Sequence, residues 1–571
     1  MDNKTKKSFN QGRRDSIKYL STLGTMGLSG CCFNIRPNPK INENNLRAAD
    51  NELRILAPDS IKKQSRSPKY CIDAHAHLFN ASDVNVKGYL EGPVANSMES
   101  ETLRKLVKAL AIVVEAIADI APTAAQEYDD LNTLVAGLGA FRSTKQRTTT
   151  LYSRLQSKRD QVAQELFNEM VKKKTDVLYL QALDEFYAKS GLRLKSKPTF
   201  TLEMVRDAVE PETRQRKLRS LDTQKTATRL SQDPGGVLEF IGHMLTDRWG
   251  NLLTYQKYYT SDPGSFGVDA VFSSLVDFDY WLDCIPPSAR SDQVKLHSRL
   301  SLLSGGYMLP LVAYNPWTDI KHDNGSLQLV KDAINKYGFI GVKIYPPNGF
   351  YAYGNETINN ATKQDRPNLK ALDKKLEEMF GWCADNRVPV MAHTAQSMGS
   401  DNDANLFGGP EGWRALLYKF SNQQNVPIIN AGHFGGDESG NNWTTEFGKM
   451  MKTSSGKHVY ADVGYWDGLE RCQSKDCLPI KRIKSALTAS DNIAKHRIMY
   501  GTDWLMSSKE AGWPDYPFHL QQQIKDLLPT ERFFYQNALD CFGLNKGGAQ
   551  REKIEKIFER QPGGLPHWMQ V

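Results

Sequence analysis

The chain has 571 residues, 40% hydrophobic and 24% charged, which is long enough to bury a large core and gives no bias toward disorder. Its formal charge is 73 − 65 = +8, and residues 1–30 supply +4 of this through six Lys or Arg against two Asp. The remaining +4 is spread over the rest of the chain, so composition gives no support for nucleic-acid binding.

The first residues have the order of an export signal. Arg13-Arg14 precede a mildly apolar, uncharged stretch from Tyr19 to Gly30. This resembles a bacterial twin-arginine signal, although Ser16 stands where that pattern favours Phe. The alternative is a basic N-terminus with a chance pair of Arg, but basic, apolar and small residues in that order favour export.

The segment Leu28-Ser29-Gly30-Cys31 resembles a lipobox, which would make Cys31 the lipidated N-terminus. We therefore expect residues 1–31 to be an export signal and residues 32–67 to be a flexible tether. The protein would then be a bacterial lipoprotein, periplasmic or at the cell surface. Its membrane contact would be through the lipid anchor alone.

The apolar run Tyr70-Cys71-Ile72 predicts a strand that continues into Asp73-Ala-His75-Ala-His77. Side chains alternate between the faces of a strand, so His75 and His77 point the same way. Two imidazoles on one face can bind one metal ion. Alone, a His-x-His pair is a weak signal, because an isolated histidine is more often a hydrogen-bonded core residue.

A long stretch after this strand, about residues 95–233, predicts mainly helix. Apolar residues recur at helical spacing from Leu103 to Ile117, and no segment reaches the length of a transmembrane helix. We interpret the stretch as an insertion over the mouth of a barrel, a cap or lid. Its run of basic residues favours a solvated face over a binding patch; the run comprises Arg214, Arg216, Lys217 and Arg219.

Strand-like and helix-like segments alternate through the rest of the chain, which predicts an α/β fold. The strand-like segments are mostly apolar, as in parallel sheets buried on both faces. They are Gly267–Phe272, Tyr307–Val312, Phe339–Pro346, Val388–His393, Val426–His433 and Arg497–Asp503.

Three of these segments end in a residue that can bind a metal or move a proton. These residues are His393, His433 and Asp503, while Lys343 lies within another strand. In a β/α barrel the chemistry lies at the C-terminal ends of the strands. The aromatic residues near strand ends, Tyr345, Tyr465, Trp466 and Trp504, are either pocket residues or ordinary loop anchors.

The same segments resemble the amidohydrolase superfamily, above all the amidohydrolase-related group that includes aminocarboxymuconate-semialdehyde decarboxylase. The resemblance runs from about Lys69 to Leu544 and is absent from the insertion. It implies a (β/α)8 barrel of the TIM type over residues 68–545, followed by a C-terminal tail over 546–571. It is carried by Asp73–His77, Pro389–His393, Gly432–Gly436, Gly501–Asp503 and Phe534–Ala538.

The resemblance also implies a ligand set and a reaction. One divalent ion, which we expect to be Zn²⁺, would be held by His75, His77, His393 and Asp503. Its bound water would attack an amide, lactone or ester-like bond of a small organic substrate. Asp503 would accept a proton, and His433 would act as the general acid or base.

Several alternatives stay open at this point. Lys343 could be carboxylated and bridge two metal ions, could face the substrate, or could be structural. The same cluster could decarboxylate a small unsaturated or aromatic acid, and a third reading is a lipid-anchored binding module without turnover. A homo-oligomer is compatible with all three.

Other chemistry finds no support in the sequence. The eight cysteines are too sparse for a disulfide scaffold, although Cys472 and Cys477 are spaced for one disulfide in an oxidising compartment. Phosphate-binding loops, a dinucleotide fingerprint and a serine nucleophile elbow are all missing.

Overall fold

The computed structural model describes residues 54–58, 68–98, 100–138, 144–189, 198–222, 233–260, 267–322, 325–357, 369–397, 404–437, 440–470, 472, 476–559, 561 and 564–570. All of them belong to one compact unit, Asn44–Val571. The expected export signal, Arg13-Arg14, the lipidation site Cys31 and almost all of the expected tether lie outside the described residues.

Eight parallel strands form one sheet, and their spatial order follows their order in the chain. Each strand is short and buried, because helices cover the outer face and side chains fill the inside. The strands are β1 (Ile72–Ala76), β2 (Ala270–Ser274), β3 (Met308–Ala313), β4 (Gly341–Ile344), β5 (Val390–His393), β6 (Ile429–Gly432), β7 (Val459–Asp462) and β8 (Ile498–Met499).

Hydrogen bonds between β1 and the segment that follows β8 close the sheet into a barrel. The amide of Ala74 donates to the carbonyl oxygen of Tyr500 at 3.0 Å, and the amide of Asp503 donates to that of His75 at 2.7 Å. Asp73 adds two buried hydrogen bonds, because its carboxylate accepts one from the backbone amide of Thr502 and one from its hydroxyl. This confirms the predicted α/β class and the (β/α)8 barrel.

Helices follow the strands and form the outer layer of the barrel. They are α11 (Asp279–Leu282) and α12 (Arg290–Leu303), α13 (Pro316–Lys321) and α14 (Gly325–Lys336), α15 (Leu369–Asp385), α16 (Ala404–Phe407) and α17 (Pro410–Lys419), α18 (Trp443–Lys452), α19 (Asp467–Glu470) and α20 (Leu478–Ala489), then α21 (Tyr516–Ile524) and α22 (Asn537–Cys541). A disulfide, which the spacing of the two cysteines allows, joins Cys472 to Cys477 between α19 and α20.

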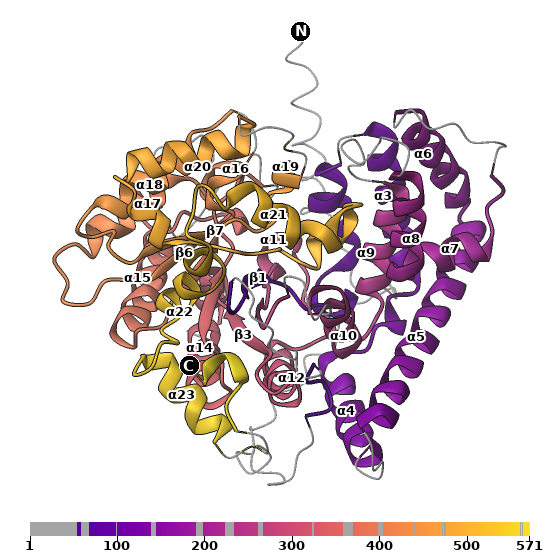
Figure 1. The fold of residues 1–571 in the computed structure, drawn as a ribbon, viewed down its shortest axis with the longest axis horizontal. Coiled ribbons are helices and arrows are strands. Elements are labelled where there is room, and N and C mark those ends of the chain that lie inside the picture. The colour runs from indigo at the N-terminus through magenta and orange to yellow at the C-terminus, as the bar shows by residue number, and fades with distance from the viewer. Residues whose placement is uncertain are drawn as a thin grey trace, which may run out of the picture. The chain divides into compact units, whose positions relative to one another are not determined.

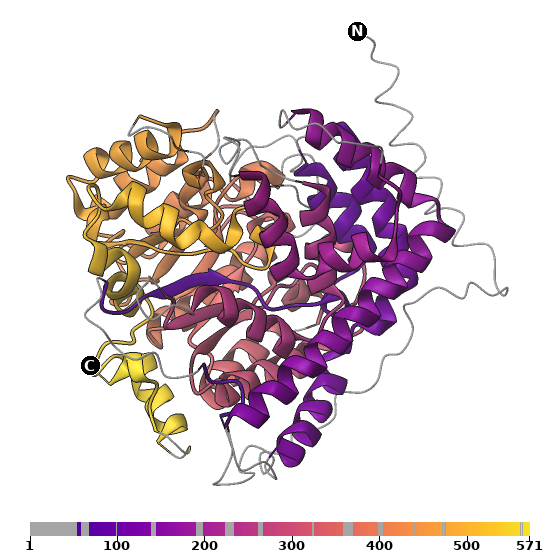
Figure 2. The same cartoon turned by 45° about the vertical axis from the view of Figure 1, so that its right-hand side comes forward.

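A large helical insertion separates β1 from β2, as predicted. Its helices lie together beside the barrel in both views (Figures 1 and 2). They are α2 (Val86–Tyr89), α3 (Glu101–Ala116), α4 (Ala124–Leu138), α5 (Thr144–Lys172), α6 (Thr175–Lys189), α7 (Leu202–Val209), α8 (Pro211–Asp222), α9 (Pro234–Met244) and α10 (Arg248–Tyr259). Among the described residues, no helix is both long and apolar enough to cross a membrane.

The C-terminal segment of the chain packs against the end of the barrel at which the strands begin. Helix α23 (Ala549–Phe558) is followed by Trp568 and Met569, which are fully buried beside Phe272 and Phe542. The Trp568 indole donates to the carbonyl oxygen of Gly306 at 3.2 Å. The barrel is therefore filled at this end and leaves its other end for chemistry.

One residue of the basic run corrects our expectation of a solvated face. Arg216 and Lys217 are exposed, but the Arg214 side chain is only 4% exposed. It pairs with Asp233 and Glu239 at 2.5 Å each. The local charge density predicted solvation, but two acids brought together by the fold offset the cost of burying Arg214.

Arg214 also ties the insertion to the barrel. Its guanidinium donates to the carbonyl oxygen of Ser508 at 3.5 Å and to that of Glu510 at 3.4 Å, in the segment after β8. Glu239, in turn, accepts from the indole of Trp513 at 2.8 Å. The insertion therefore holds the segment that follows the last strand.

Replacing Arg214 by Met should destabilise the protein strongly, because Asp233 and Glu239 would be left buried without their cation. We expect a loss of about 3–5 kcal/mol in the free energy of unfolding, measured by urea denaturation. Arg216→Met is the matched control on the same helix and should change it by less than about 0.5 kcal/mol. Equal effects of the two variants would contradict the burial of Arg214.

Candidate metal centre at the barrel mouth

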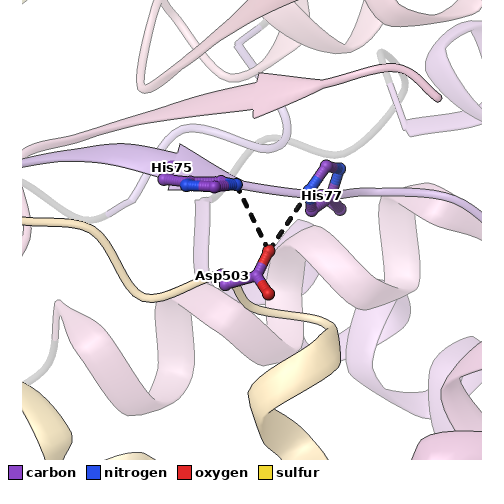
Figure 3. A group of neighbouring side chains, drawn as sticks. All are labelled: His75, His77 and Asp503. Carbon is purple, nitrogen blue, oxygen red and sulfur yellow. Dashed lines mark ion pairs between the residues drawn. The ribbon is translucent and has the colours of Figure 1, made fainter. Parts of the chain in front are cut away.

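Two histidines and one aspartate converge where β1 and β8 end. The Nε2 atoms of His75 and His77 lie 3.4 and 3.2 Å from Oδ1 of Asp503. Figure 3 shows both imidazoles turned toward this carboxylate. One nitrogen or oxygen atom from each residue lies within 4.8 Å of the others, and all three residues are buried. The fold therefore gathers a His, His, Asp donor set that fits one divalent ion.

The opposite ring nitrogens of the two histidines are anchored. Nδ1 of His77 lies 2.9 Å from the carbonyl oxygen of Ser274, which can only accept, so this nitrogen carries the proton. Nδ1 of His75 lies 2.8 Å from Oδ1 of Asp462. With Nδ1 donating, the lone pair of each ring is on Nε2 and faces Asp503, as metal binding requires.

Asp462 was missed by the sequence analysis. It is the last residue of β7 and is fully buried. Its carboxylate also accepts from the side-chain amide of Asn430 and from the backbone amide of His433. The signal was present, because Val459-Tyr-Ala-Asp462 is another short strand that ends in a carboxylate.

Glycines make room for the His75 ring. A Cβ at Gly464 would lie 2.8 Å from Nδ1 of His75, and one at Gly501 would lie 2.8 Å from its Cβ. At Gly432 a Cβ would lie 3.1 Å from Cε1 of the same ring. Glycine at these strand ends therefore lets the imidazole reach the middle of the barrel mouth.

His393 and His433 lie beside the three converging residues. Their rings are 4.4 Å apart between centroids, and the His433 ring is 4.6 Å from that of His75. His393 is not part of the converging group of three, but its Nε2 is buried and has no hydrogen-bond partner among the described residues. His433 donates from Nδ1 to the carbonyl oxygen of Gly464 at 2.8 Å.

Lys343 lies at the centre of the same cluster. It is 3% exposed, and its Nζ is 3.1 Å from Nε2 of His75. Burial lowers the pKa of Lys343 to about 8, while the carboxylates of Asp503 and Asp462 raise it. An amine with this pKa is partly neutral near pH 8, which suits either carboxylation or contact with a substrate.

The site favours the protonation states that a metal requires. Burial lowers the pKa of His75, His393 and His433, so these rings are neutral at pH 7. Burial works against ionisation of Asp503, but the imidazoles of His77 and His75 beside it hold the pKa of that carboxyl well below its usual value.

An arc of aromatic rings joins two of these histidines. Starting at His77, each ring is within 6.4 Å of the next, and the last is 4.7 Å from His393. The rings are Phe79, Tyr89, Phe278 and Tyr345. The sequence pointed only to Tyr345, because the other three lie in loops and in α2.

Comparisons with known proteins give only distant likenesses. No protein-family model matches the chain, and no curated protein matches it. Solved structures that resemble it include an amidohydrolase from Burkholderia multivorans with bound zinc, at 11% identity over 48% of this chain and 83% of that one, with a TM-score of 0.31.

Two further solved structures are of proteins described as catalysing different reactions. One is described as a probable 2-pyrone-4,6-dicarboxylic acid hydrolase from Acinetobacter baumannii, at 13% identity over 48% of this chain and 84% of that one, with a TM-score of 0.27. The other is a 2,6-dihydroxybenzoate decarboxylase, at 14% identity over 49% and 85%, with a TM-score of 0.29.

Removing the carboxylate of Asp462 should weaken metal binding although Asp462 is not in the converging group. In Asp462→Ala the His75 ring loses the partner that fixes its orientation, and we expect metal affinity to fall about 10–100-fold. Competition with a chelator measures this. Asp269→Ala, which removes a buried carboxylate at the other end of the barrel, should leave metal affinity unchanged. A similar fall in both variants would contradict the orienting role.

Proposed function

We propose that this protein is a metal-dependent hydrolase of the amidohydrolase-related kind, acting on an amide, lactone or ester-like bond of a small organic substrate. The observation that carries the proposal is the convergence of His75 Nε2, His77 Nε2 and Asp503 Oδ1 at the C-terminal mouth of a β/α barrel. The sequence resemblance points to the same residues. We expect one ion, with Zn²⁺ as the preferred metal for this donor set.

The metal would be held by His75, His77 and Asp503, with His393 as the fourth ligand that the resemblance implies. His393 suits this place because its buried Nε2 lacks a partner among the described residues. A divalent ion bound there would act as a Lewis acid and would lower the pKa of a water molecule. Asp503, ionised in the site, could accept a proton from that water.

His433 is the residue best placed to move a proton. Its Nδ1–H is committed to the carbonyl oxygen of Gly464, which leaves Nε2 as the basic atom. Burial lowers its pKa, so the ring is neutral and able to accept a proton at pH 7. Its ring packs between those of His75 and His393, next to the groups that would bind the metal.

Decarboxylation is the competing reaction of the same centre. It would need the same donor set and a proton donor beside the substrate carbon. His433 could be that proton donor. The aromatic arc from His77 to His393 favours a flat substrate for either reaction. A screen of small esters, lactones, amides and aromatic acids, scored for hydrolysis and for carbon dioxide release, distinguishes the two.

The metal centre is tested by metal content. Purified protein should carry about one equivalent of zinc or a similar divalent ion. The double variant His75→Ala, His77→Ala should lose the metal and all turnover, because two of the three converging donors are gone. His322→Ala, His458→Ala removes two histidines elsewhere and should keep both. Unchanged metal content in the first variant would exclude this site.

His433→Ala should separate proton transfer from metal binding. We expect metal content near that of the unmodified protein and turnover lower by on the order of 10²-fold or more, on whichever substrate the screen identifies. Loss of metal in parallel with activity would instead make His433 a ligand. A two-metal centre that includes a carboxylated Lys343 would then be the better interpretation.

A further inference from the structure

A second buried lysine lies near the proposed metal centre. Lys509 ends the short helix η10 (Met506–Lys509), which follows Asp503, and it is 2% exposed. Its Nζ lies over the rings of Tyr465 and Phe240, 5.4 and 5.7 Å from their centroids. Among the described residues, no carboxylate forms an ion pair with it and no hydrogen-bond acceptor contacts it.

This arrangement is unfavourable for the protein alone. An ammonium group that leaves water loses its hydration, and two cation–π contacts recover only part of that loss. Burial lowers the pKa of Lys509, while the nearby carboxylates of Glu510, Asp503 and Asp467 raise it without pairing with it. An anion bound beside Nζ would supply the missing partner.

The backbone of Lys509 is held in place from both sides. Arg214 donates to the carbonyl oxygens of Ser508 and Glu510, the two neighbours of Lys509. Helix α9 packs so closely that a Cβ at Gly236 would overlap the carbonyl oxygen of Lys509. The insertion therefore fixes the backbone from which this side chain extends, and a fixed backbone favours a preorganised binding site.

The position of Lys509 relates it to the reacting groups. Tyr465, over which its Nζ lies, directly follows Gly464, the residue whose carbonyl accepts from His433. The Asp503 carboxylate is near enough to raise the pKa of Lys509. Arg214, which bonds the backbone on either side of Lys509, already pairs with two acids and so does not compete with Lys509 for an anion. A single ammonium balances the one negative charge of a carboxylate, whereas a phosphate group carries a charge of about −1.5 to −2 at pH 7.

We propose that Lys509 binds a carboxylate of the substrate and so selects flat, monoanionic carboxylic acids that pack against the aromatic arc. This inference rests on the proposed metal-dependent function and names the substrate class of the same site. Lys509 would act in specificity and positioning, while bond cleavage would stay with the groups around His75, His77 and Asp503.

The test uses the full-length, zinc-loaded protein with benzoate and its neutral analogue benzamide, titrated by calorimetry. Lys509→Met should weaken benzoate binding about tenfold or more, as expected for a lost charge-assisted hydrogen bond, and leave benzamide binding unchanged. Lys509→Arg should restore part of the benzoate affinity. Lys370→Met, which removes an exposed lysine of α15, should bind benzoate like the unmodified protein.

A stability measurement separates a binding role from a structural one. If Lys509 has no partner within the protein, Lys509→Met should melt at the same or a higher temperature than the unmodified protein. Lys509→Gln, which is polar and uncharged, serves in its place if the Met variant does not fold. A lower melting temperature together with unchanged benzoate binding would overturn the proposal in favour of a structural cation.

Three further results would overturn it. Equal benzoate affinity in both proteins, or no saturable benzoate binding to the unmodified protein, would remove the carboxylate site. Inorganic phosphate binding more tightly than benzoate would exclude the carboxylate assignment. Zinc content measured on the same samples separates a failure of the proposed metal centre from a failure of the proposed role of Lys509. Protein without zinc contradicts the metal centre, whereas zinc-loaded protein with equal affinities contradicts only the role of Lys509.

Discussion

The hydrogen bond between His75 Nδ1 and the Asp462 carboxylate is the constraint on which the barrel mouth depends. It directs Nε2 of His75 toward Asp503, and the same carboxylate accepts from the backbone amide of His433. The ring can occupy this position because the strand ends around it carry glycine at 432, 464 and 501. Asp462 and these three glycines thus position both His75, a ligand of the proposed metal, and His433, the proposed proton carrier.

The insertion also holds part of the chain next to the barrel mouth. Arg214 is buried between two acids of its own region and also bonds the backbone on either side of Lys509. The segment after β8 therefore carries Asp503 at one end, fixed to β1, and Lys509 at the other, fixed to the insertion. This gives the insertion a physical role next to the site, because it holds the backbone that carries Lys509.

Much of this could be predicted from the sequence because short apolar strands that end in His or Asp are local patterns. The barrel, the insertion, and the grouping of His75, His77 and Asp503 follow from such patterns and from the resemblance that they carry. Strand β7 was overlooked although it has the same pattern, and Asp462 was lost with it. The burial of Arg214 and the unpaired charge of Lys509 could not be predicted, since each depends on residues that only the folded chain brings together. The aromatic arc is of the same kind, because Phe79, Tyr89 and Phe278 come from separate loops and helices.

The central claim is that His75, His77 and Asp503 hold one divalent ion through the atoms that converge at the barrel mouth. A crystal structure of the zinc-loaded protein, with anomalous scattering recorded at the zinc edge, tests this directly. We expect one anomalous peak bonded to Nε2 of His75, Nε2 of His77 and Oδ1 of Asp503, with zinc–nitrogen distances of about 2.0–2.1 Å. We also expect Nδ1 of His75 to stay hydrogen-bonded to Asp462. Zinc bound elsewhere, or bound through Nδ1 of His75 with the Asp462 hydrogen bond broken, would contradict the account.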